Sequence, residues 1–221
     1  TGILVPTSGE IKVSGIVPFE RRRENARNIG VVFGQRSQLY WDLPLIESFE
    51  LLRAIYSIPR ERYQHNLTSF TNLLQLEEFL RTPVRQLSLG QRMRGDFAAA
   101  MLHDPNIVYL DEPTIGLDVV AKEAIREFIA EINKERGTTI ILTTHDLADV
   151  ERLCKRIVMI DKGTIIYDGD IETIKSQYAP VTRKMVVEEP DLESIIRRIY
   201  VDGYDRTHQP ESPTSETGAS V

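Results

Sequence analysis

Two short apolar runs separated by an amphipathic segment constrain the fold of this chain more than any other feature. Residues 107–110, IVYL, are β-branched or aromatic and end in two acids, and residues 138–145, TTIILTTH, form the second run. Between them, residues 119–136 place apolar side chains at helical spacing and end at Gly137, a typical helix stop. Strands that alternate with helices in this way build parallel sheets, so the sequence predicts an α/β fold.

The rest of the chain extends this pattern. Residues 28–33, NIGVVF, form a short apolar run suited to a buried strand, and residues 45–80 have helical spacing interrupted by Pro59, which predicts a helical insert. Asp146 is placed to cap a helix, and after it RIVMID and TIIYD predict a hairpin around a Lys-Gly turn.

The two ends have a different texture. The opening TGILVPTSG is typical of the end of a helix, with Gly2 as its stop, followed by a turn and a strand. A domain seldom begins on a helix stop, so we expect a truncation before Thr1. Residues 184–200 predict a strand and a short helix, and residues 208–221, rich in Pro, Ser and Thr, predict a disordered tail.

Composition limits the class of protein. A net charge of −6 argues against a surface built as a whole to bind nucleic acid, and we expect no nucleic-acid partner. The one cysteine, Cys154, cannot form an internal disulfide, which fits a reducing cytosol. No stretch approaches the roughly 18 apolar residues that a membrane-spanning helix needs.

Asp111 and Glu112 directly follow the IVYL strand. In open α/β sheets the carboxyl edge of the strands is where ligands bind. Asp111 is then placed to hold Mg²⁺, and Glu112 to orient and deprotonate an attacking water. The alternative is that the two acids cap the next turn.

Ser88 precedes a predicted helix in the sequence LSLGQ. Its hydroxyl and the free N–H groups of the first turn form an anion site, and Gly90 would let the backbone approach a phosphate closely. The alternative is an ordinary serine N-cap.

Two further polar residues follow predicted strands. His145 ends an apolar strand and precedes a helix, which puts its imidazole at the same sheet edge as the two acids. Gln35 follows NIGVVF and could offer an amide oxygen to the metal and the water. Either residue alone would be unremarkable, since hydrogen-bonded histidines and glutamines are common after strands.

Taken in order and spacing, these features resemble the ATP-binding subunit of ABC transporters from Thr1 to about Tyr178. The resemblance implies a P-loop NTPase (RecA-like) core with an inserted α-helical subdomain. It divides the chain into an incomplete ATPase core (1–44 and 105–178), a helical subdomain with the signature motif (45–104), a strand–helix extension (179–203) and a disordered tail (204–221).

The resemblance also implies a role for each matching residue. Ser88, Gly90 and Gln91 match the signature motif, which binds the nucleotide. The residues that match the other motifs are the magnesium-coordinating Asp111, the catalytic base Glu112, the interface aspartate Asp118 and the γ-phosphate-sensing His145. Counting back from LPLIES makes Gln35 the glutamine-loop residue, whereas counting forward from IGVVF reaches Gly34, and Gln38 is the fallback.

The sequence contains no G-x-x-x-x-G-K-[ST] phosphate loop. In the family TG-x-L-x-P-T-S-G follows the helix which that loop opens, so we expect the N-terminal strand and phosphate loop to lie before Thr1 and residues 1–221 to be inactive alone. The cofactors implied are ATP and Mg²⁺. The partners implied are a second copy of the subunit and an integral membrane permease, at the cytoplasmic face of the plasma membrane.

The stretch GQRSQLYWDLP and the C-terminal PDLESIIRRIY are similar to the subgroup that powers exporters of drugs or sodium. Two alternatives stay open. One is a soluble ATPase of the same superfamily, in DNA repair or translation, and the other is a non-catalytic interaction fragment.

Overall fold

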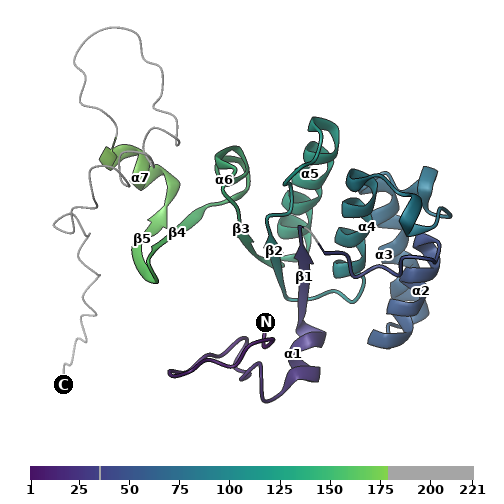
Figure 1. Cartoon of the computed structure of the whole chain (residues 1–221), viewed down its shortest axis with the longest axis horizontal. Helices are drawn as coiled ribbons and strands as arrows, with labels where there is room; N and C mark the ends of the chain where they lie inside the picture. Colours follow the sequence, from purple (N-terminus) through teal and green to yellow (C-terminus); the bar gives the residue numbers. More distant parts are fainter. Residues whose placement is uncertain (35, 179–221) are drawn as a thin grey trace, which may run out of the picture. The chain divides into compact units, whose positions relative to one another are not determined.

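A three-stranded parallel sheet organises the first part of the chain (Figure 1). The computed structural model describes residues 1–34 and 36–178, which divide into two units after Leu153. In the first unit β2 (Ile107–Asp111) lies between β1 (Ile29–Phe33) and β3 (Thr139–Thr143). The register pairs Phe33 with Asp111 and Asp111 with Thr143, so the carboxyl ends of the three strands meet at one edge.

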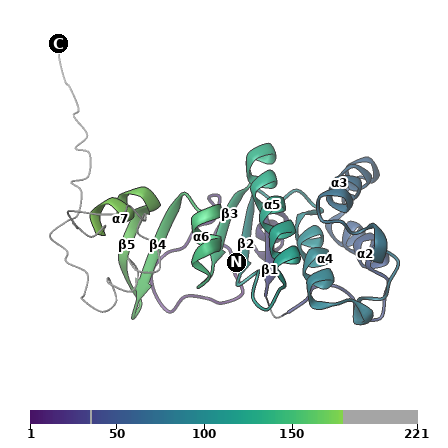
Figure 2. The same cartoon turned by 90° about the horizontal axis from the view of Figure 1, so that it is seen from above.

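Helices fill the segments between the strands. After α1 (Arg22–Asn28) and β1, the insert contains α2 (Leu45–Tyr56), α3 (Arg60–Leu73) and α4 (Leu89–Met101), with short 3-10 turns at Glu77–Phe79 and Val84–Gln86. Figures 1 and 2 show α2, α3 and α4 gathered on one side of β1. The long helix α5 (Val119–Arg136) joins β2 to β3, and α6 (Leu147–Leu153) follows β3.

The helix boundaries follow from local chemistry. Pro44 and Pro59 stand directly before α2 and α3, where a proline with its fixed φ and missing N–H is tolerated. Gly137 ends α5 in the left-handed conformation, at φ 65°, as its sequence position predicts.

One hydrophobic core runs from the sheet into the insert without a break. It contains Val32 of β1 and Val108 and Leu110 of β2 together with the apolar faces of α2, α3, α4 and α5. At its centre the ring of Phe128 on α5 packs edge-to-face against Phe70, with ring centroids 5.4 Å apart, and against Phe97, 6.1 Å apart. The insert is therefore fixed to the sheet by packing as well as by the chain.

The second unit contains the predicted hairpin. β4 (Arg156–Asp161) pairs antiparallel with β5 (Thr164–Asp170), and the turn residues Lys162 and Gly163 both have positive φ. α7 (Ile171–Tyr178) follows, with Ile174 fully buried. No helix among the described residues is long and apolar enough to cross a lipid bilayer.

The structure confirms the α/β prediction and corrects it at the start of the chain. The strand expected after the opening turn does not form. Val13 and Ile16 instead bond to each other across a tight turn, so this segment finds no partner strand among the described residues. Gln35 and the predicted elements at 179–203 and 204–221 lie outside the described residues.

Candidate functional site

Asp111 lies where the sequence places it, at the carboxyl end of β2. Its carboxylate is exposed, and its Oδ1 accepts a hydrogen bond of 2.6 Å from the Thr143 hydroxyl at the end of β3. The sequence did not single out Thr143, although its position at the end of a strand was visible. An exposed carboxylate beside a hydroxyl, at a sheet edge, is an oxygen-donor surface of the kind that Mg²⁺ prefers.

Glu112 has an unusual backbone for its residue type. Its φ is 47°, in the left-handed region, and its N–H donates to the Thr143 carbonyl at 2.9 Å. A non-glycine residue in this region costs of order 1–3 kcal/mol and persists only where its surroundings hold it. Five other non-glycine residues of the described chain also have positive φ, so the backbone of Glu112 agrees with its sequence motif but does not assign a role by itself.

His145 reaches Glu112 across the same edge. Its Nδ1 lies 2.9 Å from Glu112 Oε1, and the two side chains are 75% and 34% exposed. The hydrogen bond that the imidazole makes to Glu112, together with the negative charge of Glu112, raises the pKa of His145 above its usual value. The structure thus brings together three of the predicted site residues: Asp111, Glu112 and His145.

The residue that follows β1, Gly34, packs closely against the backbone at this edge of the sheet. Gly34 donates its N–H to the Asp111 carbonyl at 2.7 Å, and a Cβ at Gly34 would collide with the carbonyl oxygen of Glu112. Only glycine fits such an approach. Gln35 itself is not among the described residues. Its neighbour Gly34 lies against the backbone of both Asp111 and Glu112.

Ser88 and Gln91 form a capping box at the start of α4. The Gln91 N–H donates to Ser88 Oγ at 3.2 Å, and the Ser88 N–H donates to Gln91 Oε1 at 3.0 Å. The alternative reading of Ser88 as an N-cap therefore describes this structure correctly. A cap does not exclude anion binding, since the remaining N–H groups of the first turn still face outward.

Gly90 and Asp118 lie next to each other. A Cβ at Gly90 would stand 2.9 Å from Ala121 Cβ and 3.7 Å from Asp118 Oδ2, so α4 approaches the start of α5 closely. Asp118 caps α5 by accepting a 2.8 Å bond from the Ala121 N–H. In the described part of the chain, no hydrogen bond joins the group of Ser88, Gly90, Gln91 and Asp118 to Asp111, Glu112 or His145.

A buried ionic network lies behind the exposed edge. Asp149 on α6 is fully buried, accepts a 2.6 Å bond from Arg126 Nε and a short one from the Thr114 hydroxyl. One turn earlier on α5, Lys122 pairs with Asp146 at 2.7 Å. This network ties the turn after Glu112 and the helix after His145 to α5.

A second buried carboxylate, Asp96 on α4, binds the segment after Gln35. Its Oδ1 accepts 3.0 Å bonds from the Ser37 hydroxyl and the Gln38 N–H. Burial raises its pKa to about 7, although both bonds act in the opposite direction. Neither Asp96 nor Asp149 was singled out from sequence, because their partners lie 23 to 59 positions away.

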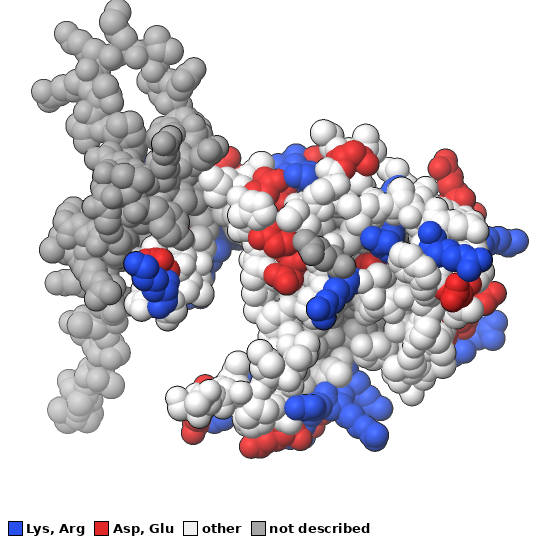
Figure 3. Space-filling view, viewed as in Figure 1, with Lys and Arg blue, Asp and Glu red and all other residues white. Residues whose placement is uncertain are grey.

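Charge on the molecular surface is mixed. On the face shown in Figure 3, acidic and basic side chains intermingle over the described part of residues 1–153. An anionic ligand would therefore be held there by individual neighbouring side chains and backbone N–H groups, and not by a broad positive electrostatic potential.

The residues at the sheet edge fit a magnesium ion that is shared with a phosphate ligand. Among residues 1–34 and 36–178 no cluster of three or more His, Cys, Asp or Glu side chains could enclose a metal by itself. Mg²⁺ usually keeps several waters and takes one or two carboxylates plus substrate phosphates. Asp111 supplies such a carboxylate.

Comparisons with known proteins identify the family of this chain. A sequence model described as "ABC transporter" matches residues 1–115. The ABC transporter ATP-binding protein NatA of Bacillus subtilis is 30% identical over 172 residues, which are 78% of this chain and 70% of that protein. The methionine import ATP-binding protein MetN 2 of Enterococcus faecalis is 27% identical over 195 residues, covering 86% of this chain and 56% of that protein.

Solved structures of ATP-binding cassettes have the same fold as this chain. The ATP-binding subunit of an ABC transporter superposes with a TM-score of 0.76 at 24% identity, covering 90% of this chain and 79% of that chain. A dimeric ATP-binding cassette bound to ADP and Pi superposes with a TM-score of 0.67 at 27% identity, covering 77% and 76%. The fold is that of the ATP-binding domains of the P-loop NTPase class.

The chain belongs to the ABC transporter ATP-binding family. The relatives of the family are named as ATP-binding proteins of ABC transporters. The chain spans 70% of the length of the NatA protein and 56% of the MetN protein.

Proposed function

We propose that this chain belongs to the ATP-hydrolysing subunit of an ABC exporter whose membrane permease is a separate polypeptide. The observation that carries the proposal is the convergence of Asp111, Glu112 and His145 at the carboxyl edge of the sheet, with His145 Nδ1 2.9 Å from Glu112 Oε1. The export direction rests on the stretches GQRSQLYWDLP and PDLESIIRRIY, whereas the MetN protein is named for import.

The proposed roles follow from this geometry. Asp111 would hold a magnesium ion together with Gln35, or with Gln38 in its place. When bound, that ion neutralises charge on the phosphates. Glu112 is the general base: its half-exposed carboxylate orients a water and takes its proton. His145, bonded to the same carboxylate, fixes its orientation and donates to the γ-phosphate when that group enters the site.

The proposal includes a second copy of the chain. The signature residues Ser88, Gly90 and Gln91 would face the nucleotide of the partner copy, with Asp118 at the interface. In support, the surface around them exposes apolar side chains: Leu89 is 39% exposed, Val119 82% and Val120 72%. Exposed apolar side chains that cluster in this way are typical of protein–protein contact surfaces. A related cassette has been solved as a dimer.

The domain division predicted from sequence is retained in the proposal. Residues 1–44 and 105–178 would form the ATPase core, and residues 45–104 the subdomain that receives the permease. Exposed Trp41, Tyr40 and Ile55, beside and on α2, are the aromatic and aliphatic surface we assign to that contact. The subunit would then work at the cytoplasmic face of the membrane.

Residues 1–221 alone are proposed to hydrolyse no ATP, because they contain no phosphate-loop sequence. The nest of N–H groups and the lysine of such a loop hold most of the triphosphate charge. Activity tests therefore use a version of the chain to which a phosphate-loop segment has been added at the N-terminus.

The test is the Glu112→Gln substitution in that version. We expect ATP binding to persist and phosphate release to fall by about 10² to 10⁴, because the general base is gone. The bound ATP should also hold the two copies together for longer, which sedimentation in Mg-ATP would report. Turnover near the wild-type rate would remove Glu112 from the proposed role.

A further inference from the structure

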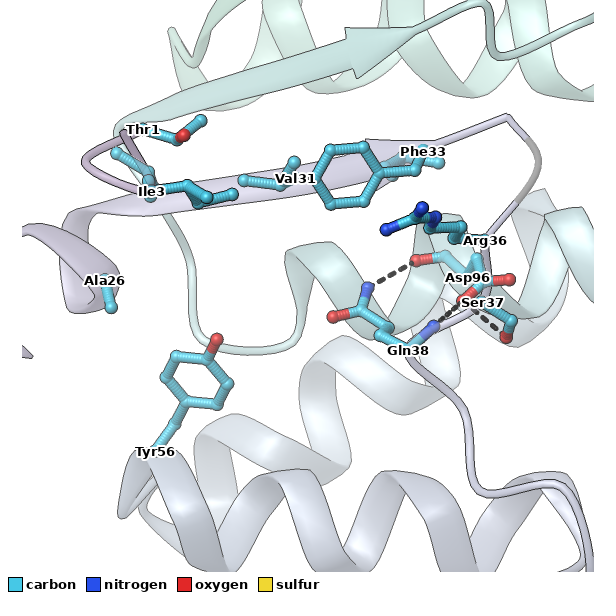
Figure 4. Close-up of a pocket in the computed structure, with 12 residues that line it drawn as sticks. Thr1, Ile3, Ala26, Val31, Phe33, Arg36, Ser37, Gln38, Tyr56 and Asp96 are labelled. Atoms are coloured by element: carbon cyan, nitrogen blue, oxygen red, sulfur yellow. Dashed lines mark hydrogen bonds between the residues drawn. The ribbon is translucent and has the colours of Figure 1, made fainter. Parts of the chain in front are cut away.

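The segment that follows Gln35 is clamped onto α4 by one buried side chain. Asp96 is 2% exposed, and its Oδ1 accepts from both the Ser37 hydroxyl and the Gln38 N–H at 3.0 Å. The Gln38 side chain returns the contact, because its Nε2 donates to the Asp96 carbonyl at 3.2 Å. Figure 4 shows these bonds at one end of a cavity whose other walls include Val31 and Phe33.

Apolar packing holds the same segment in place from the adjacent residue of α4. A Cβ at Gly95 would stand 2.8 Å from Leu45 and 3.1 Å from Leu39, so only glycine lets these leucines lie so close to the helix. The Leu39 N–H donates to Ser37 Oγ at 3.1 Å, which orients the hydroxyl toward Asp96. The segment is thus held by Asp96 on one side and by Leu39 on the other.

Burial of the Asp96 carboxylate is offset only in part by these contacts. Its Oδ2 is buried and has no hydrogen-bond partner among the described residues. Burying a carboxylate with one bare oxygen is unfavourable, and releasing the segment would leave the other oxygen bare as well. Displacement of the segment and displacement of Asp96 are therefore energetically linked.

α4 connects this contact to the signature residues. Ser88 caps the helix, and Asp96 lies eight positions later on the same continuous helix, about two turns away. Because α4 is buried over most of its length, we expect it to move as one body.

We propose that Asp96 is a positioning residue that fixes the segment after Gln35 to α4. Within one copy, this contact keeps the loop beside the magnesium ion at a set distance from Ser88, which faces the nucleotide of the partner copy. The inference rests on the proposed function for its catalytic consequence but not for the contact itself. The two parts are tested by separate measurements.

The contact is tested by amide hydrogen exchange on the whole chain without nucleotide. In Asp96→Leu, which has a similar shape and no acceptor, we expect the Gln38 and Leu39 amides to exchange at least about tenfold faster. Asp96→Asn keeps an Oδ1 acceptor and should retain protection. Asn66→Ala is the control: Asn66 is 1% exposed and bonds the Leu102 carbonyl, far along the chain from this segment.

The catalytic consequence is tested in the version that carries a phosphate loop. We expect Asp96→Leu to lower kcat about tenfold with KM for ATP changed by less than about twofold, since positioning acts on the transition state. Asp96→Asn should restore kcat, and Asn66→Ala should leave kcat per folded molecule unchanged.

Several outcomes overturn the proposal. One is unchanged Gln38 exchange in Asp96→Leu, and another is the same acceleration in Asn66→Ala. A third is an Asp96→Asn enzyme as slow as Asp96→Leu. If the parent hydrolyses no ATP at all, the proposed function has failed, while the exchange experiment still decides whether Asp96 holds the segment.

Discussion

Two ionic pairs near the carboxyl ends of β2 and β3 differ in burial more than in chemistry. Glu112 and His145 form an exposed pair, whereas Asp149 and Arg126 form a pair in which the carboxylate is fully buried and the guanidinium side chain is 13% exposed. Exposed pairs contribute about 0–1 kcal/mol to stability, whereas breaking a buried pair costs about 3–5 kcal/mol. The exposed pair therefore has little value for folding, and it lies at the carboxyl edge of the sheet, where α/β folds bind their ligands.

The largest effect should come from the buried pair. Asp149→Ala leaves Arg126 without its main partner and the Thr114 hydroxyl without its acceptor, so we expect the free energy of unfolding to fall by about 3–5 kcal/mol. Denaturant unfolding followed by circular dichroism measures it.

The matched control for this substitution is an exposed pair. Asp42→Ala removes the 2.9 Å contact with Arg85, in which the two side chains are 77% and 54% exposed, and should change stability by less than about 1 kcal/mol. Equal losses in the two variants would show that burial does not separate these pairs.

A smaller effect is expected from the other buried carboxylate, and it depends on pH. Burial raises the pKa of Asp96 to about 7, so the folded protein holds this proton more tightly than the unfolded chain does. Its contribution to stability is therefore present at low pH and is lost as pH rises between about 4 and 7, by at most about 1.4 kcal/mol per pH unit.

Asp96→Asn removes this titration. Relative to wild type, the variant should gain stability as the pH rises from 4 to 7.5, measured as the difference between two unfolding curves at each pH. A difference that stays flat with pH would mean that Asp96 titrates at its ordinary pKa.

These buried groups also show where sequence reasoning reached its limit. Asp111, Glu112 and His145 could be predicted to meet, because each directly follows an apolar strand and parallel strands share one carboxyl edge. The partners of Asp96 and Asp149 could not, because contacts between residues on separate helices leave no local pattern. An aspartate inside an amphipathic helix has no feature that marks it as buried.

The start of the chain illustrates the same limit for the fold. Residues 10–16 have strand-forming side chains, yet a strand needs a partner, and Val13 pairs only with nearby Ile16. The helix at Arg22–Asn28 was not predicted, because its arginine-rich sequence carries little apolar periodicity.

The smallest effect concerns the exposed pair itself. Glu112 raises the pKa of His145, so the pair's contribution to stability is fully present below the unfolded pKa and is lost as pH rises through the folded pKa. An NMR titration of the His145 ring should give a pKa above that of a free histidine, and Glu112→Gln should return it to the ordinary range. A titration that Glu112→Gln does not shift would mean that the two side chains are not bonded in solution.

Glu112→Gln and Asp149→Ala, both made in the version that carries a phosphate loop, separate the chemistry of the exposed pair from the stability given by the buried pair. Both the free energy of unfolding and the rate of phosphate release per folded molecule are recorded. We predict that Glu112→Gln keeps its stability within about 0.5 kcal/mol and loses about 10²-fold or more in rate. Asp149→Ala should lose stability and keep its rate within about tenfold. The reverse pattern, an unstable but active Glu112→Gln and a stable but inactive Asp149→Ala, would contradict the assignment of chemistry to the exposed pair.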